Sequence, residues 1–428
     1  MRKLVILFLI ISALWCLLSG CGGGGATPPT PTPTPANTYS ISVNAYDKST
    51  GQALPGVSLS IVETGQNINL NNGSYQTNLN SGQYTIYLSK SGYIAKGYIF
   101  NLTAATVINA YLNQVNSIEN YGTVSGSVLD SGNNYSGSFD VCTANQTTVN
   151  DTPNITSPFS NITSVCGNIA VSVYTTTSNG IAQIVYLKTS LSSGGSQTGL
   201  GLTLPASPLN YSGAKPAGDT LVVKQSDGDI LASQTTANTS YSFGMALLSG
   251  DSLTLESSLS QAVSNASYCY FTRVAAGSSG GTFNLQYQTA VPGFTEKTNN
   301  SSYYEIDFNQ VNFASYYEVY AIQITGSDSQ VPIEVIGLSG TSVKVPRNLL
   351  ASGADTTLIC VRAVDLPGFN ITTILNGNQG YQNYSYTEND QTLTLGSSLL
   401  RALNFNQNLK ALITRTKTKY HLNYLCTE

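Results

Sequence analysis

Histidine and tryptophan are nearly absent from this chain of 428 residues, which contains one of each, His421 and Trp15. A Ser-His-Asp or Cys-His catalytic arrangement needs a histidine as its base, so it would have to use His421. That residue lies near the end of the chain in a segment with weak structure signals, and we interpret it as a surface side chain. A histidine-based metal site would lack ligands, because one histidine is too few. No other catalytic motif stands out, and the sequence predicts a protein that is not an enzyme.

Charged residues are also scarce. Asp, Glu, Lys and Arg make up 9% of the chain and give it a net charge of −4. A mildly acidic chain without basic clusters lacks the electrostatic footprint of a nucleic-acid-binding protein. Solubility must come from Ser, Thr, Asn, Gln and Gly, which is common among exported β-proteins. We therefore expect no nucleic-acid partner.

An apolar run from Leu4 to Leu18 follows the basic start Met1-Arg2-Lys3. The run is shorter than the ~20 residues needed to span a bilayer. A charged start, an apolar stretch and small residues at the end are typical of a secretory signal. The last four residues of this segment, Leu18-Ser19-Gly20-Cys21, resemble the lipobox of bacterial lipoproteins.

The lipobox resemblance implies that residues 1–20 are a signal peptide and that Cys21 is acylated through its sulfur as the new N-terminus. Two or three acyl chains, palmitate among them, anchor a protein stably in a membrane. Gly22 stands where an aspartate would resemble an inner-membrane retention signal, which favours the outer membrane if the cell is Gram-negative. Residues 21–37 then form a linker, in which glycines precede a Thr-Pro repeat that favours extended polyproline II.

Disulfides are possible in an exported chain. The nearest pair of cysteines in the mature sequence is the first candidate for a bridge, and a second pair is a further candidate. These pairs are Cys142 with Cys166 and Cys269 with Cys360, which leaves Cys426 over. Because no Cys-x-x-Cys spacing occurs, the cysteines indicate no zinc site, and we expect neither a metal nor another cofactor.

Residues 38–114 carry strand signals throughout. Ile41, Val43 and Ala45 alternate with polar side chains, which is the period of a half-buried strand. Short motifs follow in a fixed order: Val43-x-Ala45-x-Asp47-x-x-x-Thr50-Gly51, Leu54-Pro55-Gly56-Val57-x-Leu59-x-Ile61, Gly73-x-Tyr75-x-Thr77, Gly82-x-Tyr84-Thr85-Ile86 and Gly92-Tyr93. They resemble the carboxypeptidase regulatory-like family, a seven-stranded transthyretin-like β-sandwich with a carbohydrate-binding-like fold. The resemblance implies a spacer or accessory domain without the metal ligands of a peptidase.

Residues 118–295 are less distinctive. Strands are expected at 169–175, 181–188, 220–225, 252–257 and 282–288, with clusters of turn residues between them. We expect either one large or two small β-sandwiches in this region.

Residues 300–390 contain a second set of strand motifs. The motifs are Ile306-Asp307-Phe308, Ala314 to Ile322, Ser342 to Leu350 and Leu358 to Asp365. They resemble strands B, C, E and F of a fibronectin type III domain. The strand-B tryptophan of that family is missing, and Phe308 would have to fill its place. The tail, 391–428, has a different character and is expected to form either a small helical cap or a disordered end.

Carboxylate and tyrosine pairs are the remaining candidates for chemistry. Asp227-Gly228-Asp229 would suit calcium, but it lacks the further ligands of a calcium loop, and we interpret it as a plain turn. Glu305 and Asp307 share one strand face, where exposed acids are usually solvated. Tyr303-Tyr304 and Tyr316-Tyr317 could stack on a sugar or a protein partner, but tyrosine also has a high strand propensity, and we favour ordinary sheet filling.

The sequence thus predicts an all-β chain of serial β-sandwich domains, anchored in the bacterial cell envelope by an N-terminal lipid. The leading hypothesis is a non-catalytic scaffold for display, adhesion or the binding of glycan or another envelope protein. The alternative is a surface-anchored carbohydrate-active hydrolase that uses Asp/Glu pairs within 118–295, because accessory modules often accompany enzymes. A cleft with two facing carboxylates would favour this alternative.

Overall fold

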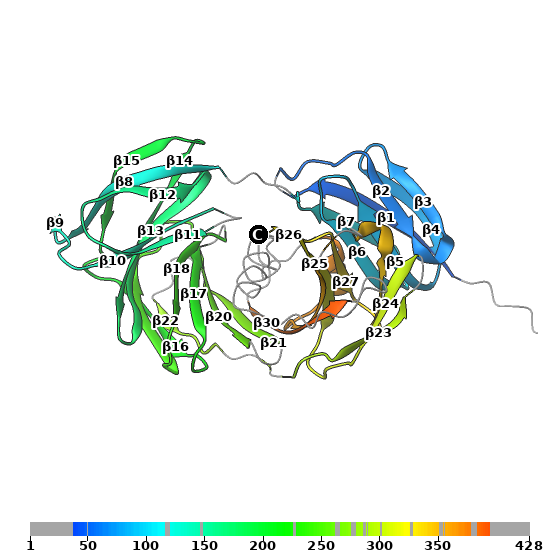
Figure 1. Ribbon diagram of the computed structural model, residues 1–428. Coiled ribbons are helices and arrows are strands. Elements are labelled where there is room, and N and C mark those ends of the chain that lie inside the picture. Colours follow the sequence, from blue (N-terminus) through cyan, green and yellow to red (C-terminus); the bar gives the residue numbers. More distant parts are fainter. Residues whose placement is uncertain are drawn as a thin grey trace, which may run out of the picture. The chain divides into compact units, whose positions relative to one another are not determined.

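The structure is a computed structural model that describes residues 37–48, 50–115, 120–145, 149–225, 228–261, 266–274, 280–285, 288, 290–299, 302–325, 328–350, 354, 356–377 and 383–393. The chain divides into two units, Met1–Asn37 and Thr38–Glu428, and all strands belong to the second. Its regular structure is nearly all β (Figure 1), so the predicted all-β fold of serial sandwiches is confirmed. The signal, Cys21, most of the linker and the chain beyond residue 393 lie outside the described residues. Within the described part, no helix is long and apolar enough to cross a membrane.

Seven strands between residues 38 and 112 form the first sandwich. One sheet has the order β4-β1-β7, and the other contains β3-β2-β5-β6. The alternation seen in the sequence explains the packing, because Ile41, Val43 and Ala45 of β1 are all 0% exposed in the core. The strands are β1 (Thr38–Asp47), β2 (Val57–Ile61), β3 (Gln66–Leu70), β4 (Ser74–Asn80), β5 (Gly82–Ser89), β6 (Ala95–Leu102) and β7 (Thr106–Leu112), with the 3-10 helix η1 at Val62–Thr64.

The last part of the described chain forms a second sandwich. The sheet β23-β24-β28 faces the strands β27, β25, β29 and β30 across a core that contains Phe308. Phe308 is buried, and its ring centroid lies 4.5 Å from that of Tyr317. The elements are β23 (Phe294–Asn299), β24 (Tyr303–Phe308), β25 (Tyr316–Thr325), β26 (Asp328–Gln330), β27 (Ile333–Gly337), β28 (Ser342–Pro346), η2 (Arg347–Leu349), β29 (Thr356–Asp365), α2 (Ile371–Leu375) and β30 (Asn383–Leu393).

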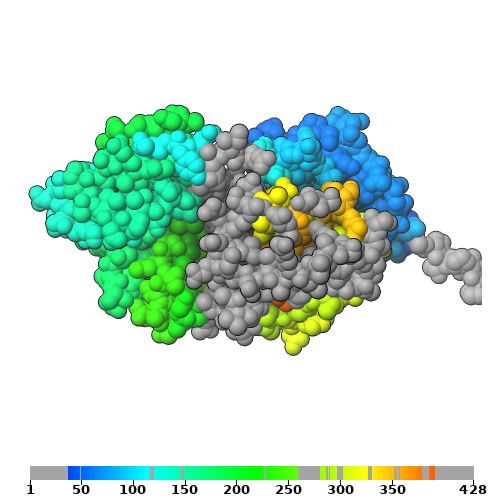
Figure 2. Space-filling view, viewed as in Figure 1, coloured from blue at the N-terminus to red at the C-terminus, as the bar shows by residue number. Residues whose placement is uncertain are grey.

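The first and last sandwiches share a sheet. Strands β6 and β27 pair in parallel, from Ala95 opposite Ile333 to Ile99 opposite Gly337. The order β3-β2-β5-β6-β27-β25-β29-β30 is therefore continuous, and we call the β6–β27 pair the seam. The two segments lie side by side in the space-filling view, blue against yellow (Figure 2).

Two hydrophobic cores cross the seam, one on each face of the shared sheet. On one face, the core of the β4-β1-β7 sandwich also contains Tyr316, Ile336 and Leu375 from the last region. On the other face, Tyr87 and Ile99 of the first sandwich pack into the core beneath β23-β24-β28. The two sandwiches therefore bury apolar surface together and form one packed body.

Residues 120–285 form three layers of sheet. The central sheet, β11-β10-β13-β14-β19-β16-β22, has β12-β8-β15 on one face and β18-β17-β20 on the other, with a separate core in each space. The strands are β8 (Tyr121–Asp130), β9 (Asn133–Asn134), β10 (Phe139–Ala144), β11 (Val149–Ile155), β12 (Phe159–Val165), β13 (Gly167–Thr177), β14 (Gly180–Leu191), β15 (Ser196–Thr203), β16 (Leu209–Ala214), β17 (Thr220–Gln225), β18 (Ile230–Thr235), β19 (Ser240–Met245), β20 (Leu253–Gln261), β21 (Ala266–Val274) and β22 (Gly281–Thr282).

The strands expected in this region are found in large part. Those at 169–175, 181–188 and 220–225 fall within β13, β14 and β17, and 252–257 overlaps β20. Of the strand expected at 282–288, Thr282 lies in β22, residues 283–285 are not in a strand, and residues 286 and 287 lie outside the described residues. Strand β21 pairs with β20 and with β30, so the sheet of the middle region continues into that of the last region.

Candidate functional site

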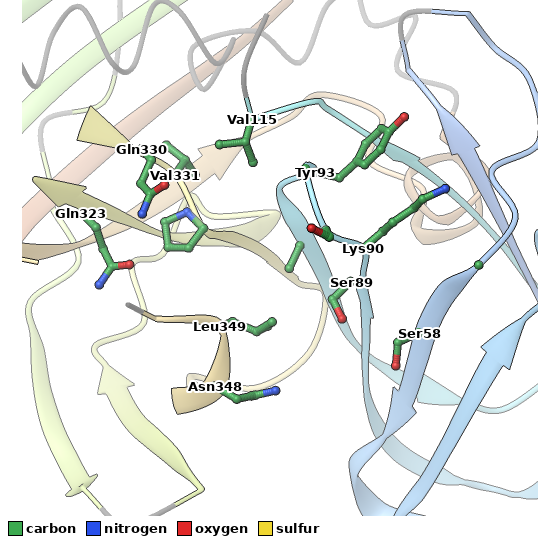
Figure 3. Close-up of a pocket in the computed structure, with 15 residues that line it drawn as sticks. Ser58, Ser89, Lys90, Tyr93, Val115, Gln323, Gln330, Val331, Asn348 and Leu349 are labelled. Carbon is green, nitrogen blue, oxygen red and sulfur yellow. The ribbon is translucent and has the colours of Figure 1, made fainter. Parts of the chain in front are cut away.

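A pocket of about 500 Å³ lies beside the seam (Figure 3). Its walls come from the two sandwiches that share the sheet. The first sandwich contributes Ser58 of β2, Ser89 of β5 and the turn between β5 and β6. The last region contributes Gln323 and the segment Gln330–Pro332, with Asn348 and Leu349 of η2 nearby. Figure 3 shows Gln323 and Gln330 on one side and Ser58 and Ser89 on the other.

The rim on the side of the first sandwich is fixed by hydrogen bonds. The Tyr93 amide donates to the Lys90 carbonyl at 3.1 Å and closes the turn. The Tyr93 hydroxyl donates to Oδ2 of Asp47 at 2.7 Å, and this bond and burial raise the pKa of Tyr93. Lys90 Nζ donates to the Pro55 carbonyl at 2.7 Å and lies 5.6 Å from the centre of the Tyr93 ring. The turn is therefore held in place before any ligand arrives.

The opposite wall is fixed by the seam itself. The Ala95 amide donates to the Pro332 carbonyl at 3.0 Å, which ties the start of β6 to the residue before β27. Gln323 is 1% exposed, and its Nε2 donates to the Thr357 hydroxyl at 3.0 Å. The pocket thus has two rigid sides whose spacing is set by the strand pairing.

The chemistry of the pocket is uncharged and polar. Hydroxyls and amides dominate its polar surface, and Lys90 is the one charged residue among the lining residues that the structure describes. None of these described residues is Asp, Glu or His. Hydroxyl and amide groups of this kind can bind a hydroxyl-rich ligand.

Buried charges lie on the other face of the shared sheet, because successive side chains of a strand alternate between faces. Lys96 of β6 pairs with Glu334 of β27 at 3.6 Å. Arg362 of β29 lies between Glu318 of β25, at 3.0 Å, and Glu388 of β30, at 2.7 Å. We call these five residues the charged row, and it runs across neighbouring strands from one sandwich into the other.

Burial and neighbouring charges shift the pKa of Glu318 in the row and of Lys48 beside it. Burial raises the pKa of Glu318 to about 7, although the Arg362 guanidinium opposes this change. Beside the row, burial and then the positive charge of Lys96 lower the pKa of Lys48 to about 8, against the pull of Glu334. Each shift follows from placing several ionisable groups in a poorly solvated space. The row is completed by internal ion pairs and does not line the pocket.

The candidate disulfide between Cys142 and Cys166 is not formed in the structure. Both residues are free thiols, because Cys142 lies within one core and Cys166 packs against a different one. Cys142 Sγ donates to the Ile230 carbonyl at 3.3 Å, and Cys166 Sγ donates to the Ser192 carbonyl at 3.2 Å. Burial raises the pKa of the Cys142 thiol, which makes it a poor nucleophile.

The second candidate pair, Cys269 with Cys360, is separated by strand β30. Cys269 is opposite Tyr386, whereas Cys360 is opposite Asp390 and is buried. Neighbouring strands lie ~4.8 Å apart, and bridged cysteines have Cα atoms within ~7 Å. Two strand spacings and the register offset along β30 place these backbones too far apart for a bridge.

The other residues singled out in the sequence have structural partners or lie outside the described part. Asp229 is buried, and its Oδ2 accepts a bond from Gln225 at 2.9 Å, while Asp227 lies outside the described residues. Glu305 accepts a bond from the Ser342 hydroxyl at 3.1 Å. Tyr304, Tyr316 and Tyr317 are buried in cores, so sheet filling is confirmed for them. His421 and Cys426 lie outside the described residues. No group of three or more potential metal ligands occurs in the part of the chain that the structure describes.

A hydrolase in 118–295 would need a pair of facing carboxyl groups. Every Asp and Glu of this region that the structure describes accepts a hydrogen bond from a neighbouring group of the fold. These contacts are Asp130 with Ser131, Asp140 with the Asn154 amide, Asp151 with Tyr174, Asp219 with Ser257, Asp229 with Gln225, Asp251 with Tyr186 and Lys188, and Glu256 with Lys224. These contacts indicate structural roles for the carboxylates.

Sequence reasoning did not find the pocket. Ser58 and Ser89 are ordinary polar positions of a strand, and Gln330 lies in a different sandwich. Only the parallel pairing of β6 with β27 brings them together, and no local pattern in the sequence predicts this pairing.

No protein-family model and no curated protein matches this chain. Solved structures that match include the Bacillus anthracis TIE protein, with 10% identity, 59% of this chain and 51% of that chain covered, and a TM-score of 0.16. A leucine-rich repeat protein from Bacteroides thetaiotaomicron matches with 11% identity, coverage of 39% and 26%, and a TM-score of 0.15. BcpA, the major pilin subunit of Bacillus cereus, matches with 8% identity, coverage of 59% and 100%, and a TM-score of 0.17. This chain spans about half the length of the first of these structures. Similarity at this level carries no argument about function.

Proposed function

We propose that this protein is a non-catalytic binding scaffold of the bacterial cell envelope, anchored by lipid at Cys21. The observation that carries the proposal is the pocket beside the seam, which is polar, uncharged apart from Lys90, and without a carboxylate in its lining. A site of this kind holds a ligand without acid–base chemistry. The shared sheet keeps its two walls at a fixed spacing.

The two resemblances support a modular scaffold. Residues 38–112 contain seven strands in two sheets, as a carboxypeptidase regulatory-like domain would. In the last region, β23-β24-β28 and β27-β25-β29-β30 have the pairing order of a fibronectin type III sandwich, with Phe308 buried in its core. Both kinds of domain serve as spacers, which suits a protein held at a membrane by a Gly and Thr-Pro linker.

The anchoring is tested by expression of the full chain and of Cys21→Ser in a Gram-negative host, followed by membrane fractionation and labelling with a palmitate analogue. We expect the wild type in the outer-membrane fraction with label, and the variant unlabelled and out of that fraction. Label that persists in Cys21→Ser, or a wild type without label, would contradict the anchor.

The non-catalytic role is tested by incubation of the purified protein with soluble and insoluble polysaccharides, followed by assay of released reducing ends. We expect none above a heat-denatured control. Reproducible release would favour the hydrolase alternative, and replacement of Asp251 and Glu256 by the corresponding amides would then show whether the region 118–295 is responsible.

A further inference from the structure

We infer that the pocket beside the seam binds a neutral saccharide, held by residues of both sandwiches. This inference depends on the proposed binding role and adds the chemical class of the ligand. Its volume of about 500 Å³ lies within the usual range of about 300–1,000 Å³ for small-ligand sites. The following steps concern charge, hydrogen bonding and shape.

The charge of the lining excludes strongly ionic ligands. A cationic ligand would need a carboxylate, and the lining residues that the structure describes include none. An anionic ligand would need Arg or several Lys, but Lys90 stands alone, and its Nζ already donates to the Pro55 carbonyl at 2.7 Å. Bidentate recognition of a carboxylate or phosphate by guanidinium is likewise absent from the lining. An uncharged ligand is the one that the pocket can desolvate at least cost.

The polar groups of the lining match the hydroxyls of a sugar. A serine hydroxyl both donates and accepts, and a glutamine amide offers two donors and an acceptor. Ser58 is exposed on β2, Ser89 is half-buried at the end of β5, and Gln330 is half-buried across the pocket. A ring with neighbouring hydroxyls can therefore hydrogen-bond to both walls at once. A purely apolar ligand would leave the polar groups of the walls without hydrogen bonds.

Apolar groups in the same lining would contact the C–H face of the ring. Pro332 and Leu349 are half-buried in the lining and present this surface, whereas Val331 is 0% exposed and belongs to a core. A pocket that combines such a surface with uncharged donors and acceptors fits the amphipathic character of a pyranose. Because the ligand would touch Ser58 and Gln330 together, its binding should also stabilise the joined sandwiches.

The experiment uses the full chain without its signal, with Cys21→Ala to keep it soluble. Binding to maltohexaose, cellohexaose and mannohexaose is measured by calorimetry, with a hexamer of galacturonate as the anionic comparison. Two variants alter the pocket, Gln330→Ala and Ser58→Tyr. The matched control is Ser74→Tyr, because Ser74 is also an exposed strand serine of the first sandwich but lies outside the pocket.

We expect at least one neutral hexamer to bind and to raise the melting temperature. Both pocket variants should weaken its affinity by about tenfold or more, while Ser74→Tyr stays within about twofold of the wild type. The inference is overturned if no neutral hexamer binds, if only the galacturonate hexamer binds, or if the pocket variants bind as the wild type does. Failure here leaves the result at Cys21 untouched, so the anchor and the ligand class are tested separately.

Discussion

At the scale of single residues, the charged row is the feature that departs most from the sequence pattern. Glu318, Glu334 and Lys96 alternate with apolar residues in their strands, which ordinarily marks a solvated face. In the structure the side chains of Glu318 and Arg362 are 4% and 3% exposed. Local alternation predicts which residues share a face, but whether that face meets water depends on contacts that are distant in the sequence.

Ion pairing makes the burial of this row tolerable. Arg362 is held between two carboxylates, and the Tyr320 hydroxyl donates to Glu388. An isolated buried charge would destabilise the folded protein by several kcal/mol. Removal of one partner of the ion pair would therefore lower the free energy of unfolding by a similar amount. With one guanidinium for two carboxylates, Glu318 is the group most readily protonated, which agrees with its raised pKa.

The pH dependence of stability should reveal Glu318. Its pKa is about 7 in the folded chain and about 4.3 in an unfolded chain, so between these values the folded state holds a proton that the unfolded state has lost. The contribution of this proton to the free energy of unfolding is therefore full below about pH 4.3 and is lost as the pH rises through 7. It amounts to roughly 4 kcal/mol at most.

The measurement is the free energy of unfolding in urea at pH 5 and pH 8. We expect the free energy of unfolding of the wild type to fall from pH 5 to pH 8, and that of Glu318→Gln to fall much less. Asp130→Asn, which changes an exposed acid of β8, should decline as the wild type does. An identical decline in Glu318→Gln and the wild type would show that Glu318 stays ionised throughout this range.

At the scale of elements, the strands themselves were the most predictable part. Alternation in Val57, Leu59 and Ile61 predicts β2, and all three side chains are 0% exposed. The seam was not predictable. The two faces of β6 are similarly apolar in the sequence, and its partner strand β27 begins far along the chain, at Ile333. A parallel pair needs no connecting turn, so neither strand carries a local signal for the other.

Gly97 is the residue that permits the close approach at the seam. A Cβ at this position would lie 2.8 Å from two ring carbons of Tyr87 and 3.1 Å from Cγ2 of Val335. The Tyr87 ring cannot move aside freely, because its hydroxyl donates to the Lys344 carbonyl. Gly97→Ala should therefore lower the free energy of unfolding by about 1–3 kcal/mol, measured in urea.

Gly201→Ala is the control for this substitution. Gly201 also lies within a strand, β15, but a Cβ there would meet nothing within 4 Å. The free energy of unfolding of Gly201→Ala should stay within about 0.5 kcal/mol of the wild-type value. Equal effects of the two substitutions would mean that the seam is not tightly packed around Gly97.

At the scale of the whole molecule, the shared sheet changes the meaning of the domain boundaries. The sequence divides at 38–114 and 300–390, and the structure has one sandwich built on β1–β7 and another built on β23–β30. Yet each sandwich completes its core with residues of the other, such as Leu375 in one direction and Ile99 in the other. The pocket likewise depends on residues of both sandwiches. Neither the unit of folding nor the site could therefore be predicted from one of the two ranges alone.

Unfolding should therefore be cooperative across the two ranges. In a chain that begins at residue 21, Trp15 is absent, and a single tryptophan can be placed in each sandwich as a probe, by Tyr39→Trp and by Phe308→Trp. Tyr39 packs at the edge of one core and Phe308 lies within the other. We expect the two fluorescence transitions in urea to coincide, as they do for a two-state unit. Each substitution can itself change the stability of the protein. A difference between the two unfolding midpoints that is larger than this effect would contradict a joint unit.

The seam also has a consequence for the order of events during synthesis and export. Strand β6 ends at Leu102, and its partner β27 begins at Ile333, so roughly 230 residues separate the two. At about 5–20 residues per second, the ribosome needs on the order of 10–50 s to cover that distance. During this interval the edge of β6 has no partner from its own chain and can pair with other chains. Only the emergence of Ile333–Gly337 supplies the partner that closes this edge of the sheet.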